Sequence, residues 1–327
     1  MDKKQEEMQF LGLFGICKES YNIIFKWRKI FSQITLALIL PTAFVFIANM
    51  KVSNALFAKI TDAIQVSWMQ SVAGTPDQIE LSLPNSISWT QLLFFKALYI
   101  TFLLFFSSLS TAAVVYTIAC IYTGQDVGFK MVMRVVPKVW KRLVITSTCA
   151  LAAIFASTIA TLLTIAVIRI MISRYIPAIV FVLLVLFFMG FVYITLVWQT
   201  ANVVSVLEEA YGIKAMIKSK ALVKGKTKVT GTIILMMTIS FVIMKTAFSR
   251  LVDGSSLGMV NRVSYGIVCF LLLVLLILFE LVIQTVAYFV CKSYHHENID
   301  KSTILDHLDA GYHGYAPLKA EDAQPEK

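Results

Sequence analysis

Six long stretches of this sequence contain no charged residue, and they constrain the fold more than any other feature. A helix needs about 20 apolar residues to cross about 30 Å of hydrocarbon, and the stretches hold between 16 and 33 residues each. The chain is 58% hydrophobic and 15% charged, whereas soluble domains are about 25% charged, so a water-soluble globule is excluded. The stretches lack the alternation of barrel strands, and lipid offers no partner to unpaired backbone groups. We therefore predict an all-α, polytopic membrane protein with transmembrane helices near residues 30–50, 93–119, 143–171, 177–200, 229–249 and 264–291.

Lysine and arginine are distributed unevenly between the two ends of these helices. Segments 1–29, 120–142, 201–228 and 292–327 together hold 21 of the 29 Lys and Arg residues. Loops rich in Lys and Arg stay on the cytoplasmic side of a membrane, so both termini are expected in the cytoplasm. An endomembrane of the ER type and the plasma membrane both fit this pattern. The expected regions are a cytoplasmic amphipathic segment at 1–29, a six-helix membrane domain at 30–291 and a largely disordered cytoplasmic tail at 292–327.

Three of the basic segments resemble one another, and each precedes a predicted pair of transmembrane helices. Gly15, Gly128 and Gly212 are each followed after 12 residues by a basic group, at 27–29, 140–142 and 224–226. Polar and apolar residues recur at helical spacing in these segments, which is typical of helices lying in the membrane interface. Pro137 is expected to kink or end the second helix. We expect three repeats of an interfacial amphipathic helix plus a transmembrane hairpin. The alternative stays open that these segments are not repeats and are basic only because cytoplasmic loops are rich in Lys and Arg.

Interfacial helices of this kind would place their cations against anionic lipid headgroups. Membrane lipids are therefore the expected partners, and other membrane proteins are a second class left open. The net charge of +10 is explained by topology, so nucleic acid is not expected as a partner. The expected headgroup contacts are Lys26, Arg28, Lys29, Lys130, Arg134, Lys138, Lys141, Arg142, Lys214, Lys218, Lys224 and Lys226.

The third segment carries a recognisable motif. It reads LEEAYGIKA at 207–215, followed by Ser219 and by LVKGK at 222–226. This resembles a repeated signature of the membrane domain attached to some bacterial glycerophosphodiester phosphodiesterases. The whole chain, with its MDKKQEEMQFLG start and GYHGYAPLK tail, is similar to a plant family of multi-spanning transmembrane proteins. In those bacterial enzymes a separate soluble barrel carries out catalysis, and this chain contains no counterpart of it, so the resemblance implies a membrane fold without phosphodiesterase activity.

Motifs for other chemistry are missing. The Gly-Lys-Thr at 225–227 is not a phosphate-binding loop, because position 220 is lysine where that motif needs glycine. The four histidines lie in the tail, and none of the five cysteines forms a CxxC pair. We expect no catalytic residue, no metal and no cofactor.

Glu280 interrupts the last apolar run near its middle, and Gln284 follows one helical turn later. A carboxyl group at this depth is costly and usually faces protein or water. Two hypotheses remain open, a site that couples proton or solute movement and a carboxyl group hydrogen-bonded between helices for packing. The sequence thus favours a non-enzymatic integral membrane protein that organises lipid or other membrane proteins through its basic segments. The alternative is a transporter or channel that uses Glu280 and Gln284.

Overall fold

The computed structural model describes residues 8–72, 86–125, 127–171, 176–253 and 259–295, and within these ranges every regular element is a helix. Two short π-helical turns, η1 and η2, continue neighbouring α-helices. In chain order the elements are α2 (Leu13–Lys26), α3 (Arg28–Ile34), η1 (Thr35–Ile39), α4 (Leu40–Val72), α5 (Ser86–Thr123), α6 (Phe129–Met171), α7 (Ile176–Leu207), α8 (Ile213–Val223), α9 (Thr227–Phe248), η2 (Ser249–Asp253) and α10 (Met259–Tyr294).

Six helical runs among the described residues are long and apolar enough to cross a membrane, which confirms the predicted number of spans. Each run has at least 26 residues, more than the approximately 20 that hydrocarbon requires. The runs therefore tilt or extend beyond the hydrocarbon. They are Arg28–Leu56, Thr90–Thr123, Phe129–Val167, Val180–Leu207, Thr227–Val252 and Met259–Tyr294.

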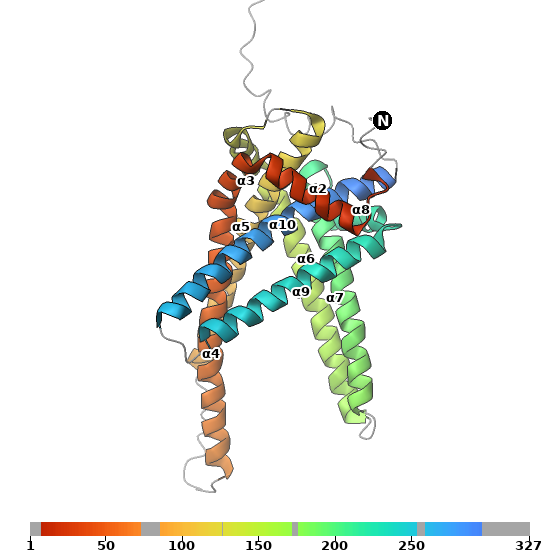
Figure 1. The fold of residues 1–327 in the computed structure, drawn as a ribbon. Coiled ribbons are helices and arrows are strands. Elements are labelled where there is room, and N and C mark those ends of the chain that lie inside the picture. Colours follow the sequence, from red (N-terminus) through yellow and green to blue (C-terminus); the bar gives the residue numbers. More distant parts are fainter. Residues whose placement is uncertain (1–7, 73–85, 126, 172–175, 254–258, 296–327) are drawn as a thin grey trace, which may run out of the picture.

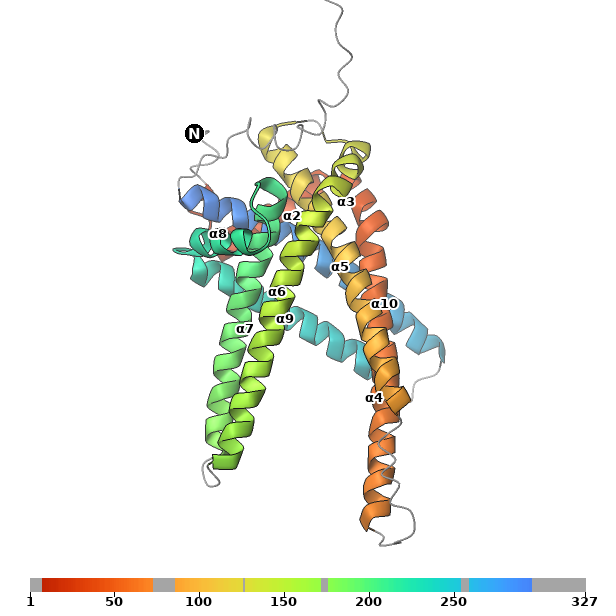
Figure 2. The ribbon, with the colours of Figure 1, turned by 180° about the vertical axis from the view of Figure 1, so that it is seen from behind.

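The spanning helices form three pairs of sequence neighbours, α4 with α5, α6 with α7 and α9 with α10 (Figures 1 and 2). The α9–α10 pair crosses the other two obliquely (Figure 1). Helices α2 and α8 and the last turns of α10 all lie at one end of the bundle. We call this the basic end, because most of the lysines and arginines of the described chain lie in or beside these segments and the start of α6; the opposite end is the far end.

The packed core is concentrated at the basic end. The end of α5, the start of α6, the end of α7 and the second half of α10 contribute to one contiguous cluster of buried apolar side chains. Its largest fully buried members include Tyr116, Leu143, Tyr288 and Phe289. Lipid gives no hydrophobic driving force between helices, whereas water does. Packing therefore stabilises the fold most where side chains are buried near a water-facing end of the bundle.

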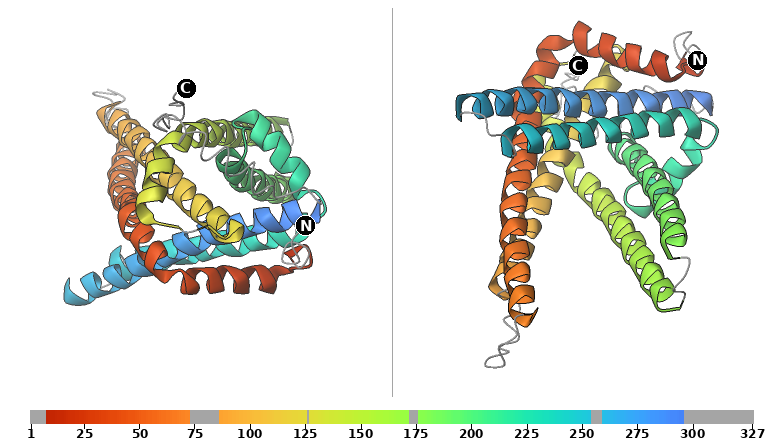
Figure 3. Two further views of the ribbon diagram at one scale, coloured as in Figure 1. Left: turned by 90° about the horizontal axis from the view of Figure 1, so that it is seen from above. Right: turned by 60° about the horizontal axis from the view of Figure 1, so that its bottom comes forward.

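The far halves of α6 and α7 pack against each other and stand apart from the other helices (Figures 1 and 3). Their large apolar side chains point outward: Phe155, Ile159 and Leu163 of α6 and Phe181 and Met189 of α7 are 57–67% exposed. Such exposure is unfavourable in water and costs little in lipid, so this hairpin has the surface of a membrane-embedded element.

Helix α2 is separated from the first spanning helix by a break at Trp27, where φ is −107° and ψ is 30°. Ile16, Ser20 and Ile23 form its buried face, and it packs against α10 and α9. Seen from above, α2 lies at full length along the edge of the bundle (Figure 3). It therefore runs across the spanning helices, as an interfacial helix would.

Pro137 does not end the second basic segment. Helix α6 runs without interruption from Phe129 to Met171 with the proline inside it, so this segment is the first part of a spanning helix and not a separate one. Proline removes one backbone hydrogen bond and disfavours a helix interior by about 3 kcal/mol. The buried side chains of Val132, Val136 and Val139 bracket the proline, and their packing holds the helix together across it.

Two expected boundaries also move. Helix α10 continues to Tyr294, so the first residues of the expected tail belong to the membrane domain; residues 296–327 lie outside the described chain. Helix α4 continues to Val72, so the segment after residue 50 extends the first spanning helix. Most of the expected cytoplasmic segment 1–29 is ordered as α2 and the start of α3, with residues 1–7 outside the described chain.

The three proposed repeat units begin differently. The backbone carbonyls of Gly12, Gly128 and Gly212 accept the first hydrogen bonds of α2, α6 and α8, from the amides of residues 16, 132 and 216. Gly15, which the sequence spacing paired with Gly128 and Gly212, lies inside α2. Among the described residues, α2 and α8 are separate helices ahead of a spanning pair, whereas the basic segment after Gly128 is the first part of α6. The common feature is thus a glycine that starts each basic helix.

Candidate functional site

The twelve lysines and arginines expected to contact headgroups form the basic collar, and the structure places them in α2, α3, the first part of α6, α8 and the turn between α8 and α9. Ten of the twelve are exposed, and Lys218 and Lys226 are half-buried. The Lys226 ammonium lies 5.3 Å from the centre of the Tyr294 ring. A collar that is exposed in this way can meet an anionic surface without any rearrangement of the fold.

Helix α2 has a second apolar face besides the one buried against α10. Phe14, Tyr21 and Phe25 are 85%, 61% and 63% exposed, and the rings of Tyr21 and Phe25 stack with centroids 6.1 Å apart. Lys18 and Lys26 are exposed on the same helix. Aromatic residues next to lysines are the composition of helices that bind membrane surfaces.

The motif in the third segment is a packing motif. Ala215, Ser219 and Leu222 of α8 are buried, and the Ser219 hydroxyl donates a hydrogen bond of 2.7 Å to the carbonyl oxygen of Val197 in α7. Because Val197 lies ten residues before the end of α7, α8 folds back along α7. The small residues of the motif allow the two helices to approach closely.

Gly212 makes this reversal of the chain possible. Its φ of 61° and ψ of −133° lie outside the regions open to residues with a side chain. Its amide donates a hydrogen bond of 2.8 Å to the Thr146 hydroxyl of α6, which also lies 2.8 Å from the Ser205 hydroxyl of α7. The turn is therefore fixed to two spanning helices.

A buried ion-pair cluster around Glu208, which sequence reasoning missed, joins α7, α8 and α10. The carboxylate accepts hydrogen bonds from the Tyr288 hydroxyl at 2.8 Å and the Lys292 ammonium at 2.9 Å, and Lys218 lies 2.6 Å from its second oxygen. Burial by itself raises the pKa of the Glu208 carboxyl. The hydrogen bonds from Lys218, Lys292 and Tyr288 outweigh burial and hold that pKa below its ordinary value.

The Glu208 cluster changes the part that two lysines play. Lys218 belongs to the expected headgroup contacts, yet its ammonium is paired with Glu208. Lys292 was expected in a disordered tail and is instead 8% exposed within α10. The only sequence signal for this cluster was a glutamate pair directly after an apolar span, which does not identify partners 80 and 84 residues away.

Glu280 of α10 is hydrogen-bonded to α7. The Gln199 amide nitrogen donates a bond of 2.8 Å to the Glu280 carboxyl oxygen. Both side chains, with Gln284 and Thr230, line a cavity of about 10 Å³, and a cavity needs roughly 10–15 Å³ to hold one water molecule. The structure thus brings Glu280 and Gln284, the two expected intramembrane residues, together with Gln199. The one feature of the sequence that pointed to Gln199 was its position within an apolar run.

Replacing Glu280 tests what its carboxyl group contributes. Glu280→Gln is expected to leave the melting temperature in detergent nearly unchanged, because an amide oxygen can accept the same bond from Gln199. Glu280→Ala should destabilise the fold by about 1–3 kcal/mol, the cost of a buried polar group without its partner. Differential scanning fluorimetry measures both. Equal losses in the two variants would contradict a packing role.

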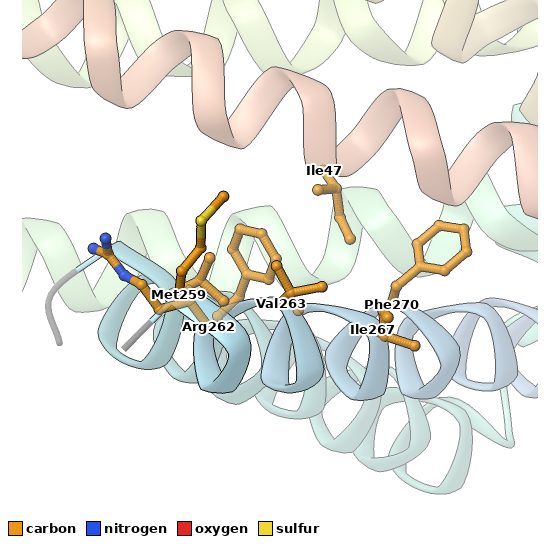
Figure 4. Close-up of a pocket in the computed structure, with 9 residues that line it drawn as sticks. Ile47, Met259, Arg262, Val263, Ile267 and Phe270 are labelled. Atoms are coloured by element: carbon orange, nitrogen blue, oxygen red, sulfur yellow. The ribbon is translucent and has the colours of Figure 1, made fainter. Parts of the chain in front are cut away.

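An apolar groove of about 350 Å³ lies at the far end, beside a small apolar cluster that joins α4, α9 and α10. Figure 4 shows Ile47 of α4 above Val263 and Phe270 of α10, with the Arg262 guanidinium at one end. Side chains of this kind suit contact with lipid chains. Among the described residues, no group of three His, Cys, Asp or Glu side chains is placed to hold a metal ion.

Six apolar spans around a helical core at one end define the class: this is an integral, multi-pass α-helical membrane protein. Within that class, the chain belongs to the DUF8558 family, described as a domain of unknown function, whose model matches residues 1–327. Neither a curated protein nor a solved structure matches the chain.

Proposed function

We propose that this protein is a non-enzymatic membrane protein that binds anionic lipid at its basic end and thereby organises the surrounding lipid or neighbouring membrane proteins. The single observation that carries the proposal is α2. It lies across the spanning helices at the edge of the bundle (Figure 3), with exposed aromatic rings and lysines on the surface that the protein core does not use.

The charge distribution supports the orientation in the membrane that this proposal requires. All twelve collar residues lie at the end where α2 and α8 lie, and clusters of lysine and arginine remain in the cytoplasm. The basic end is then cytoplasmic, in an endomembrane of the ER type or in the plasma membrane. Anionic lipids are concentrated in the cytoplasmic leaflet, where each nearby Lys or Arg contributes about 1 kcal/mol of attraction.

The proposal extends to the repeat and to the family resemblance. A glycine at the start of each basic segment is what three related units would produce. Three residues of the α8 motif are buried: Ala215, Ser219 and Leu222. Their burial is consistent with a signature that serves helix packing, in a membrane domain similar to that of the bacterial phosphodiesterases. Both ideas concern architecture and assign no catalytic residue.

Transport, the alternative function, has less support. The cavity beside Glu280 and Gln284 has room for about one water molecule, and a conducting path needs a continuous hydrated route. Proton or solute flux into proteoliposomes that is lost in Glu280→Gln would favour transport over the proposed function.

Lipid crosslinking tests the proposal directly. The full chain is placed in nanodiscs with photoactivatable phosphatidylserine or phosphatidylcholine, and crosslinks to residues 10–29 are counted by mass spectrometry. We expect a preference for phosphatidylserine that disappears at about 1 M salt, where the screening length falls to about 3 Å. Changing Lys18, Lys26, Arg28 and Lys29 together to glutamine should reduce the preference by more than about tenfold.

The matched control changes two exposed residues away from the basic end, Lys245 of α9 and Arg250 of η2, to glutamine. This variant should keep the preference at residues 10–29. Equal crosslinking of the two lipids at every salt concentration would overturn the proposed function.

A further inference from the structure

An open pocket lies where α7, α8 and α9 meet. Its volume is about 460 Å³, within the range of about 300–1,000 Å³ typical of small-molecule sites. It is distinct from the exposed face of α2 and from the cavity beside Glu280. Its walls include Tyr193 of α7, Ile217, Lys220 and Ala221 of α8, and Lys224 and Thr227.

The pocket is positively charged. Lys220 and Lys224 both line it, both are exposed, and no carboxylate is among its lining residues. The carboxylate of Glu208, which pairs with the neighbouring Lys218, is already satisfied by that lysine, Lys292 and Tyr288. Two ammonium groups four residues apart beside a hollow attract an anionic group.

The turn that carries Lys224 is fixed in place. The carbonyl oxygen of Lys224 lies 2.8 Å from the His295 ring nitrogen Nε2. Gly225 has a φ of 106°, and a side chain added there would meet the Tyr294 ring at 2.5 Å. The end of α10 therefore holds the α8–α9 turn, so the Lys224 backbone is positioned before any ligand binds.

An apolar track leads away from the two lysines along α7. Leu186, Met189 and Tyr193 follow one another at helical spacing, so they share one face of α7, and they are 62%, 63% and 43% exposed. Ile217 of α8 is 65% exposed beside the pocket. Cations at one end and exposed apolar side chains leading toward the middle of a span match a lipid with an anionic headgroup and acyl chains.

We propose that this pocket holds one anionic glycerophospholipid, with its phosphate between Lys220 and Lys224 and its acyl chains along Leu186, Met189 and Tyr193. The inference deepens the proposed function, since it rests on the same lipid-facing basic end and names one defined site within it. Lys220 is central to this site although sequence reasoning did not include it among the headgroup contacts.

Native mass spectrometry of the detergent-purified full chain tests the proposal, with phosphatidylserine, phosphatidylcholine or soluble glycerol 3-phosphate added. We expect one retained phosphatidylserine per chain and no competition from glycerol 3-phosphate, which lacks acyl chains. The pair Lys220→Gln and Lys224→Gln should weaken retention by at least about tenfold. Ala221→Trp places a large ring in the pocket and keeps both lysine charges, so this variant should weaken retention of the lipid as well.

The control pair Lys228→Gln and Lys245→Gln removes two exposed lysines of α9 that do not line the pocket. It should retain the lipid. Equal losses in the control and pocket pairs, or full retention in Ala221→Trp, would overturn the proposed site. Competition by glycerol 3-phosphate equal to that by the lipid would overturn the lipid as the ligand. Lipid crosslinking to residues 10–29 tests the proposed function independently of this pocket, so failure of one proposal can be distinguished from failure of the other.

Discussion

Glu208→Ala is expected to cost about 3 kcal/mol of stability and to lower the melting temperature of the detergent-purified chain by several degrees. Among the described residues, the substitution leaves the Lys292 ammonium, which is 8% exposed, with the Tyr288 hydroxyl at 3.3 Å as its remaining hydrogen-bond partner. Removing one member of a buried ion pair costs about 3–5 kcal/mol; the lower end applies because the Lys218 side chain is 40% exposed. Scanning fluorimetry of the two proteins at about pH 7 measures the difference.

Acidity should reduce this difference. The pKa of folded Glu208 lies below its ordinary value, so the carboxylate stabilises the fold at pH values above the ordinary pKa. That contribution is lost as the pH falls through the ordinary value and then through the lower folded one. The gap between wild type and Glu208→Ala should therefore be full at about pH 7 and shrink below about pH 4. Glu209→Gln, at the exposed neighbouring position, is the control, and a loss equal to that of Glu208→Ala would contradict the cluster's role.

Gly212→Ala is the second substitution with a large expected effect. An alanine at φ 61° and ψ −133° is strained by about 1–3 kcal/mol, and its Cβ would lie 3.4 Å from the Ile145 side chain. Strain at this point moves the amide that donates to Thr146, and with it the start of α8. We expect a loss of about 2–3 kcal/mol in stability, together with faster proteolysis between α7 and α8.

Gly128→Ala serves as the matched control, because Gly128 also starts a basic helix. An added Cβ at Gly128 meets nothing within 4 Å, so the change should stay within about 1 kcal/mol. A melting temperature of Gly212→Ala no lower than that of Gly128→Ala would show that the turn tolerates a side chain.

The sequence predicted the spans because lipid imposes a simple requirement, a charge-free helix of sufficient length, and that requirement appears directly in residue order. It could not predict partners between spans. Gln199 and Glu280 are 81 residues apart, and helical periodicity indicates a face of a helix without indicating which helix it meets. The same limit hid the three groups that surround Glu208.

Two local features show what tertiary packing adds to the sequence pattern. Pro137 was expected to kink or end a helix; it does not end α6, because buried valines on both sides of it pack into the core and hold the helix continuous. In α2, one apolar face was expected to meet lipid. The helix has two, and Ile16 and Ile23 contact the protein while Phe14 and Phe25 remain outside. Tertiary packing decided both outcomes.

The position of the core has a consequence for how the protein adapts to different membranes. The α6–α7 hairpin joins the other helices through its basic-end halves, while its far halves stand apart (Figure 1). Its inclination can therefore follow a thinner or thicker bilayer without opening the packed cluster. Helices longer than the local hydrocarbon thickness relieve the mismatch by tilting, at a cost of fractions of a kcal/mol per Å. Membranes of unequal thickness would thus change the spread of this hairpin and leave the packed cluster at the basic end unaltered.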